Sequence, residues 1–243
     1  MPRLMSRVRP PFPAPFLFCM KKHIYKAVIF DLDGTLIDSM SIWRRVDREF
    51  LGKRGIQVPD DLFAHLPQGN SYIQTAQYFK DRFKLPDSVD DIMNEWTQTV
   101  CWHYENDMVL KTGVQEVINW LIQNNIAIGM GTSNSLDLAT AALKQHDILH
   151  HFQTIITGCL ELKGKPFPDI YLKAAEELSV APEECVVIED TLSGIRAAKH
   201  AGMYAIAIYD EDSDEHRKKI MSEADFSADD YESCLEHLKK LLS

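Results

Sequence analysis

The chain has 243 residues, with 26 basic and 36 acidic side chains and a formal net charge of −10 at neutral pH. This balance argues against a nucleic-acid or anionic-membrane surface, and no apolar run approaches the stretch of about 18 residues that spans a bilayer. The five cysteines are widely separated and form no Cys-x-x-Cys pair, so we expect a cytoplasmic protein with reduced thiols. The length suits one large α/β domain, or a core domain with a smaller insertion.

The first segment of the chain is rich in proline. Residues 10–19 contain four prolines, which prevent a continuous helix, and the segment lacks the small-residue cleavage site of a signal peptide. We therefore expect residues 1–22 to form a disordered tail without a catalytic role.

The first predicted strand covers residues 27–30, an apolar run that stops at Asp31 and Asp33. Such a run is typical of a central strand in a parallel sheet, and ligands bind outside the carboxyl ends of these strands. The two carboxylates have the period-two spacing of an extended chain and can face one crevice, while Gly34 allows a sharp turn behind them. An isolated Asp-Gly pair is more often an ordinary turn, so this interpretation depends on the rest of the chain.

After Thr35 the apolar pattern changes from strand to helix. We predict helices from Asp38 or Ser39 to about residue 52, at 71–83 and at 89–104, with no strand between them. We expect residues 38–109 to form an all-helical cap inserted into an α/β core made of residues 23–37 and 110–243. Because the chain crosses twice between cap and core, the cap suits the role of a lid.

From residue 113 onward, strand and helix patterns alternate as they do in α/β folds. The acidic run at 210–215 is interpreted as a solvated loop. The predicted elements are a helix ending near 124, a strand at 126–131, a helix around 138–143, a short strand at 154–157, a helix at 167–178, a strand at 185–188, a helix ending at 201–202, a strand at 205–208 and a helix at 231–242.

Four polar motifs follow the predicted strands or lie in the loops between them: Asp31-x-Asp33-Gly34-Thr35, Thr132-Ser133-Asn134, Lys165-Pro166 and Glu189-Asp190. With these motifs in this order, residues 24–242 resemble the haloacid dehalogenase superfamily, in the phosphatase group whose helical cap lies between the first and second motifs. The resemblance implies a Rossmann-like parallel sheet, phosphoryl transfer through an aspartyl-phosphate, and a small phosphorylated metabolite as substrate. We expect a monomer that binds neither nucleic acid nor membrane.

The two carboxylates of the first motif have different expected roles in the reaction. Asp31 ends the strand and is the candidate nucleophile, while Asp33 can protonate the leaving alkoxide and then activate water. The branches of the superfamily that act on halides and phosphonates lack an aspartate at this second position, so Asp33 indicates phosphate esters.

A cation is needed at this site on electrostatic grounds. A carboxylate attacking a phosphate dianion is repelled by about 4 kcal/mol per unit-charge pair at about 4 Å and an effective dielectric of about 20. Asp31, Glu189 and Asp190, with the backbone carbonyl of Asp33, are hard oxygen ligands of the type that Mg²⁺ takes, so we expect Mg²⁺ as the cofactor.

The phosphate group needs positive partners as well. Lys165, the Thr132 hydroxyl and the backbone amides of Ser133 and Asn134 are the candidates to hold its oxygens. Each of these motifs alone has an ordinary explanation, as a helix cap, a solvated lysine or an acidic turn. Their joint occurrence with Asp31 favours one phosphate site.

The cap residues bear on the substrate. The sequence also resembles β-phosphoglucomutase-like members of the superfamily, but Trp43, Gln68 and Tyr72 stand where those mutases have histidine, lysine and arginine. Neutral side chains there remove the charge that would grip a second phosphate, which favours a phosphatase of a sugar or polyol phosphate over a mutase. A catalytically silent binding protein is the third alternative. The candidate substrate contacts of the cap are Trp43, Gly69, Asn70 and Ser71.

Overall fold

The structure is a computed structural model, which describes residues 25–62 and 71–242. The predicted N-terminal tail and the cap residues Gln68, Gly69 and Asn70 lie outside the described residues. Within the described ranges, no helix combines the length and the apolar character needed to cross a bilayer.

Six parallel strands form one sheet in the order β3-β2-β1-β4-β5-β6. The central strand β1 pairs with β2 on one side and with β4 on the other, so that Ala27 lies beside both Ala127 and Cys185. The order reverses between β1 and β4, and a crevice opens at the carboxyl ends of the strands at such a point. The strands are β1 (Ala27–Phe30), β2 (Ala127–Gly131), β3 (Thr154–Ile156), β4 (Cys185–Glu189), β5 (Tyr204–Ile208) and β6 (Phe226–Ala228).

Helices cover both faces of this sheet. Along β1, Val28 and Phe30 belong to one apolar cluster and Ala27 and Ile29 to the other, because successive side chains of a strand point to opposite faces. The first face packs against α4 (Val114–Gln123), α5 (Leu136–Gln145) and α9 (Tyr231–Leu241), and the second against α6 (Asp169–Leu178), α7 (Leu192–His200) and α8 (Arg217–Glu223). The Rossmann-like parallel sheet is thus confirmed.

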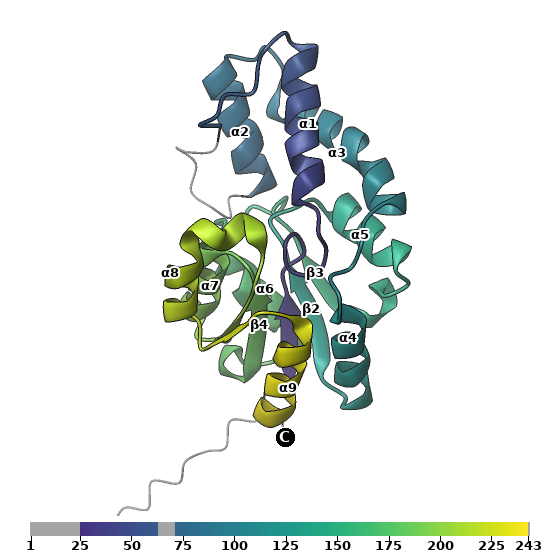
Figure 1. Ribbon diagram of the computed structural model, residues 1–243, viewed down its shortest axis with the longest axis vertical. Helices are drawn as coiled ribbons and strands as arrows, with labels where there is room; N and C mark the ends of the chain where they lie inside the picture. Colours follow the sequence, from purple (N-terminus) through teal and green to yellow (C-terminus); the bar gives the residue numbers. More distant parts are fainter. Residues whose placement is uncertain (1–24, 63–70, 243) are drawn as a thin grey trace, which may run out of the picture.

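A helical module of α1 (Met40–Lys53), α2 (Tyr72–Phe83) and α3 (Val89–Asn106) lies beyond one end of the sheet (Figure 1). Ser71 and Ser88 begin α2 and α3 with reciprocal side-chain and backbone hydrogen bonds, the pattern of a capping box. The rings of Phe50, Phe79 and Trp96 meet edge to face inside the module, so each of its helices contributes to one small aromatic core.

Most predicted elements agree with the structure to within a few residues. The pattern missed α8 and β6. The run at 210–215, interpreted as a solvated loop, is exposed at Glu211, Asp212, Asp214 and Glu215 but is not a loop. The run forms η3 (Glu211–His216), a short 3₁₀ helix in which Ser213 is buried, and Asp210 before it is buried against Lys111 with 2.7 Å between carboxylate and ammonium. Two further short 3₁₀ helices are η1 (Leu149–His151) and η2 (Pro182–Glu184).

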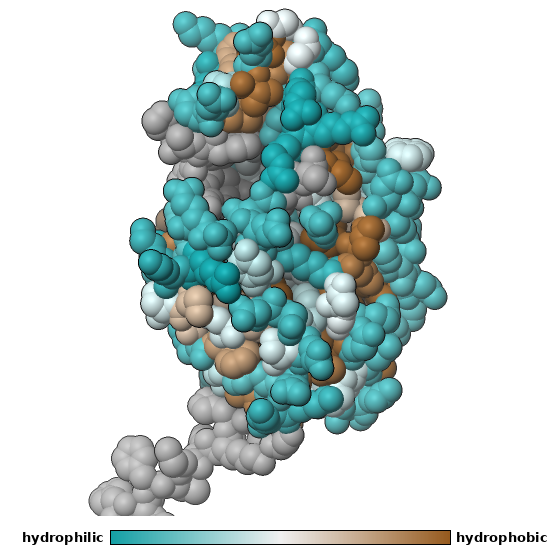
Figure 2. All heavy atoms as spheres, in the orientation of Figure 1, coloured by the Kyte–Doolittle hydropathy of each residue, from teal (hydrophilic) through white to brown (hydrophobic). Residues whose placement is uncertain are grey.

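Hydrophilic residues dominate the face seen in Figure 2.

Candidate active site

Asp31 directly follows β1 and is 5 % exposed. Its Oδ1 lies 2.5 Å from Nζ of Lys165, and the same ammonium lies 2.6 Å from Oε1 of Glu189. Lys165 comes from the loop before α6 and Glu189 ends β4, so three separate segments meet at the crevice that the strand order predicts. The predicted grouping of Asp31, Lys165 and Glu189 is therefore present in the structure.

Burial and charge determine the protonation of this cluster. Burial raises the pKa of Asp31 to about 8, with Lys165 acting in the opposite direction. Burial works against the charged form of Lys165, but Asp31 and Glu189 hold its pKa well above the usual range. Burial, together with the nearby Glu189 and Asp31, raises the pKa of Asp190 well above its ordinary value. One lysine thus faces three buried carboxylates, an arrangement that favours an additional cation.

Asp33 lies in a different environment, surrounded by uncharged donors. Its Oδ1 accepts hydrogen bonds from the Ser39 hydroxyl at 2.5 Å, from Trp43 Nε1 at 3.4 Å and from the Tyr104 hydroxyl. Its Oδ2 accepts one from the Asn134 side-chain amide at 2.9 Å. Two of the partners, Trp43 and Tyr104, belong to the helical module, so this carboxylate is held jointly by core and module.

Sequence reasoning missed two of these partners. Asp38 or Ser39 was expected to cap α1. Ser39 is the N-cap residue but makes no side-chain cap bond, and its hydroxyl bonds to Asp33 instead. Tyr104 lies on the buried face of a predicted helix, where nothing in the pattern distinguishes it from an ordinary core tyrosine. Its hydroxyl also accepts hydrogen bonds from Trp43 Nε1 at 2.9 Å and from Asn134 at 3.2 Å.

Hydrogen bonds that involve backbone groups hold the segment that follows β2. The Thr132 hydroxyl accepts a hydrogen bond from the Asn134 amide at 3.1 Å, and Ser135, not this triplet, caps α5. The carbonyl of Ser133 accepts a hydrogen bond from the Tyr72 amide at 2.9 Å, which joins the first turn of α2 to the core. Thr132 and Asn134 are both buried, and the binding of phosphate by this segment stays a prediction.

Both oxygens of Glu189 are engaged by the protein. Oε1 accepts hydrogen bonds from Lys165 and from the Tyr171 hydroxyl at 3.2 Å, and Oε2 accepts from the Thr191 amide at 2.7 Å and the Thr191 hydroxyl at 2.9 Å. A β-carbon at Gly194 would lie 1.7 Å from Oε1, so only glycine leaves room for this carboxylate. In this arrangement Glu189 holds Lys165 beside Asp31.

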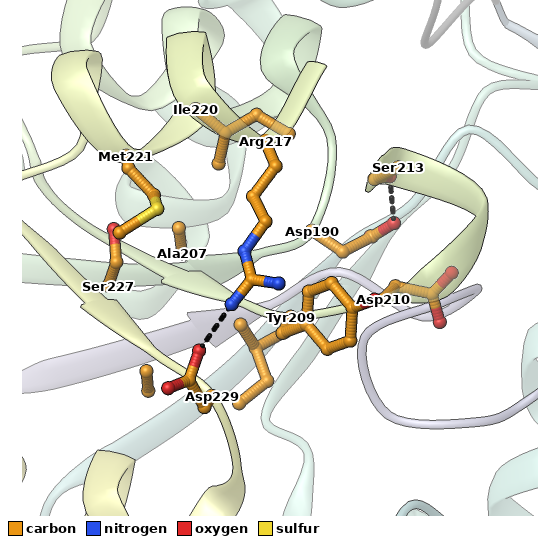
Figure 3. Close-up of a pocket in the computed structure, with 12 residues that line it drawn as sticks. Asp190, Ala207, Tyr209, Asp210, Ser213, Arg217, Ile220, Met221, Ser227 and Asp229 are labelled. Atoms are coloured by element: carbon orange, nitrogen blue, oxygen red, sulfur yellow. Dashed lines mark hydrogen bonds and ion pairs between the residues drawn. The ribbon is translucent and has the colours of Figure 1, made fainter. Parts of the chain in front are cut away.

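Asp190 is 4 % exposed and directly follows Glu189 at the end of β4. Its Oδ1 accepts a hydrogen bond from the Thr35 hydroxyl at 2.8 Å, and its Oδ2 one from the Ser213 hydroxyl at 3.1 Å. Figure 3 shows Ser213 of η3 directed toward Asp190 at the edge of a small pocket. A β-carbon at Gly34, where φ is +78°, would lie 2.6 Å from Oδ2, which explains the need for glycine in the first motif.

Another part of the same pocket is lined by the ion pair between Arg217 and Asp229. The guanidinium of Arg217 lies over the ring of Tyr209, 4.3 Å from its centroid, and donates a hydrogen bond to Asp229 at 2.9 Å (Figure 3). The positive charge of Arg217, which lines the same pocket as Asp190, is thus already paired.

The donor set fits a hard divalent cation. Oδ2 of Asp31 accepts no hydrogen bond from the described residues and Asp190 is a second buried carboxylate, so these two side chains and a backbone carbonyl can supply oxygen ligands. Within residues 25–62 and 71–242, no three histidine, cysteine, aspartate or glutamate side chains are grouped so that they could hold an ion by themselves. A ligand set of this kind is completed by the substrate phosphate and water.

Of the predicted cap contacts, Trp43 and Ser71 are described. Trp43 contacts Asp33, as above, and its ring packs edge to face on Tyr72 and Tyr104. Ser71 is buried at the start of α2, where its hydroxyl accepts a hydrogen bond from the Gln74 amide at 3.2 Å. Its contact with a substrate stays a prediction.

Comparison with known proteins agrees with this geometry. A family model described as haloacid dehalogenase-like hydrolase matches residues 25–202, so the chain belongs to that family. The phosphorylated carbohydrates phosphatase of Thermotoga maritima is 28 % identical over 181 residues, which cover 74 % of this chain and 83 % of that protein. The fructose-1-phosphate phosphatase of Escherichia coli is 29 % identical over 184 residues, or 76 % of this chain and 96 % of that one.

Among solved structures, CbbY from Rhodobacter sphaeroides in complex with phosphate has a TM-score of 0.76 and 27 % identity, covering 86 % of this chain and 95 % of that one. The fold and the family are therefore those of a haloacid dehalogenase-like hydrolase.

Proposed function

We propose that this protein is a Mg²⁺-dependent phosphatase that removes phosphate from a small phosphorylated sugar or polyol through an aspartyl-phosphate on Asp31. The observation that carries the proposal is the different environment of the two carboxylates of the first motif. Asp31 lies beside an ammonium and keeps one oxygen directed away from it, whereas Asp33 is held by four uncharged donors. Two carboxylates in such contrasting environments suit a nucleophile and an acid–base group.

The residues support a two-step reaction. Oδ2 of Asp31 attacks phosphorus while the bond to the ester oxygen breaks, and Asp33 gives its proton to the leaving alkoxide. Asp33 then takes a proton from the water that attacks the aspartyl-phosphate, which releases phosphate and restores Asp31. Lys165 and the Thr132 hydroxyl stabilise the phosphoryl oxygens throughout. When bound, Mg²⁺ supplies positive charge that offsets the repulsion between Asp31 and the phosphate dianion.

Hydrolysis is favoured over mutase chemistry by the module residues. Trp43 is neutral and bonds to Asp33, and the Tyr72 hydroxyl bonds to the Met93 carbonyl at 3.2 Å and contacts the Thr97 hydroxyl at 3.1 Å, inside the module. Neither position supplies a cation for a second phosphate. The names of the relatives, a phosphatase of phosphorylated carbohydrates and a fructose-1-phosphate phosphatase, support the same substrate class.

Phosphate release from a panel of phosphorylated sugars, polyols, nucleotides and small acids, in the presence of Mg²⁺, tests the proposal. Wild-type protein should release phosphate from p-nitrophenyl phosphate and, more efficiently, from a sugar or polyol phosphate, while Asp31→Asn should release none. No phosphate release from any member of the panel would contradict the proposal and favour a silent binding protein.

A second assay separates hydrolysis from mutase activity. The protein is incubated with β-glucose 1-phosphate and a catalytic trace of the corresponding bisphosphate, and free phosphate and glucose 6-phosphate are followed separately. We expect phosphate without any requirement for the bisphosphate. Glucose 6-phosphate formation without phosphate release would establish a mutase.

A further inference from the structure

One buried carboxylate is left unused by the mechanism. Asp47 lies in the middle of α1 and is 7 % exposed, yet no hydrogen bond or ion pair reaches it from the described residues. Buried charged groups are normally paired, because moving an unpaired carboxylate out of water costs free energy. Among residues 25–62 and 71–242 this carboxylate has no partner, so it is available to a hydrogen-bond donor from a ligand.

The position of Asp47 on α1 indicates where that partner would bind. Trp43 lies four residues earlier on the same helix face, and its indole nitrogen reaches Asp33 and the Tyr104 hydroxyl. Asp47 follows one helical turn later, about 6 Å further along the helix axis from the core. The next residue of the same stripe, Phe50, packs on Trp96 in the aromatic core of the module. Asp47 thus lies between the catalytic carboxylates and the closed interior of the module.

The opposite face of α1 is exposed and basic. Arg44 pairs with Asp212 of η3, and Arg45 pairs with Glu49 at 2.8 Å. Neither of these arginines is paired with Asp47, which lies on the inner side of the helix. The carboxylate therefore belongs to the side of α1 that carries Trp43, and not to the side that carries the surface ion pairs.

We propose that Asp47 is a specificity residue that accepts hydrogen bonds from hydroxyl groups on the substrate tail and rejects tails that carry a second anionic group. This inference rests on the proposed phosphatase function. The ligand class that it assigns is the monophosphate of a neutral polyol or sugar, with the phosphate at Asp31 and a hydroxylated tail of about four to six carbons reaching one turn along α1.

The chemistry of a buried carboxylate supports both the binding of hydroxyl groups and the rejection of a second anionic group. Its two oxygens can accept hydrogen bonds from neighbouring hydroxyls, and bonds to a charged acceptor are stronger than bonds between neutral groups. A carboxylate or second phosphate on the tail would meet like charge in a site of low dielectric, where repulsion is larger than in water. Burial also raises the pKa of Asp47 to about 7, because removal from water disfavours its charged form.

The test compares two substrates that differ in the tail. Values of kcat/KM are measured with Mg²⁺ for sorbitol 6-phosphate, a neutral polyol ester, and for 2-phosphoglycolate, whose tail is a carboxylate. The variants are Asp47→Asn, which keeps shape and one acceptor but removes the charge, and Asp47→Leu, which removes both. Glu49→Gln is the matched control, because it removes a carboxylate from the outer side of the same helix.

We expect the ratio of kcat/KM for the polyol ester over the acidic ester to fall about 10- to 100-fold in Asp47→Leu, mainly through KM, and by a smaller factor in Asp47→Asn. The Glu49→Gln ratio should stay within about twofold of wild type. Circular dichroism establishes that each variant is folded, and the isosteric Asp47→Asn keeps the test valid if Asp47→Leu does not fold.

Two results would overturn the inference, and they are distinguishable. If wild-type protein hydrolyses p-nitrophenyl phosphate but the ratio is unchanged in both folded Asp47 variants, the specificity role is wrong and the phosphatase function stands. If wild-type protein hydrolyses neither p-nitrophenyl phosphate nor the two esters with Mg²⁺, the proposed function fails and this inference fails with it.

Discussion

The hydroxyl of Tyr104, on the last turn of α3, donates a hydrogen bond to Asp33, which lies 71 residues earlier on the loop after β1. The same hydroxyl accepts hydrogen bonds from Trp43 and Asn134. Burial and the neighbouring Asp33 raise the pKa of Tyr104 well above its ordinary value, so the hydroxyl keeps its proton and remains a donor. The module thereby orients the carboxylate that we propose as the acid–base group.

Replacing Tyr104 with phenylalanine should lower kcat about tenfold, because Asp33 loses one of the donors that orient it. Steady-state kinetics with p-nitrophenyl phosphate measure the effect, and the loss should appear in kcat more than in KM. Tyr78→Phe is the control, since its hydroxyl bonds to the Leu62 carbonyl at 2.6 Å within the module. Equal kcat values for wild type and Tyr104→Phe would show that the contact does not orient Asp33.

The two aspartates of the first motif should respond differently to amidation. Asp31→Asn should abolish turnover and aspartyl-phosphate formation, whereas Asp33→Asn should slow turnover by about 10² to 10⁴-fold. Rapid quench with a ³²P-labelled substrate detects the phosphorylated protein, and thermal unfolding monitors the fold. Wild-type turnover in Asp31→Asn would exclude it as the nucleophile, and full turnover in Asp33→Asn would exclude the acid–base role.

Chelation should remove activity, and added Mg²⁺ should restore it. Excess Ca²⁺ should inhibit, because its larger and more flexible coordination shell permits geometries that disfavour in-line attack. Asp190→Asn should raise the Mg²⁺ concentration needed for half-maximal activity. Activity assays after exhaustive dialysis against a chelator give the measurement, and undiminished turnover without a divalent ion would contradict the metal assignment.

The stability of the fold should depend on pH through Asp47. Its pKa is raised from an ordinary value of 3.8 to about 7 by burial, so the native state binds a proton that the unfolded chain has released. The stability that this proton contributes is present at low pH and is lost as pH rises from about 4 through about 7. Asp47→Asn has no such loss and should exceed wild type in stability above neutral pH.

Thermal unfolding at pH 5 and pH 8 measures this difference. The gain in Tm of Asp47→Asn over wild type should be larger at pH 8, by about 2–8 °C. Glu49→Gln should show no gain, because the hydrogen bond from Arg45 lowers the pKa of Glu49 and its carboxylate is already stabilised. A pH-independent difference between Asp47→Asn and wild type would show that Asp47 is not buried without a partner in solution.

The positions of most strands and helices followed from the sequence, because the apolar period of an element is a local property. The run at 27–30 and the two aspartates after it were sufficient to predict a central strand with polar groups at its carboxyl end. The short strand β6 was missed, since its three residues carry no alternation and it is defined by pairing with β5. Helix α8 has seven residues, too few for a clear helical period.

The family and the parallel α/β class could be predicted from the sequence, because the four motifs consist of short contiguous segments. The side chains that surround the motif residues could not be predicted, because they come from segments that are distant along the chain. Ser39 and Tyr104 bond to Asp33 and Ser213 bonds to Asp190, although none of the three belongs to a motif. Their contacts depend on how α1, α3 and η3 pack against the sheet, and a pattern along the chain does not encode the distance between segments that only folding brings together.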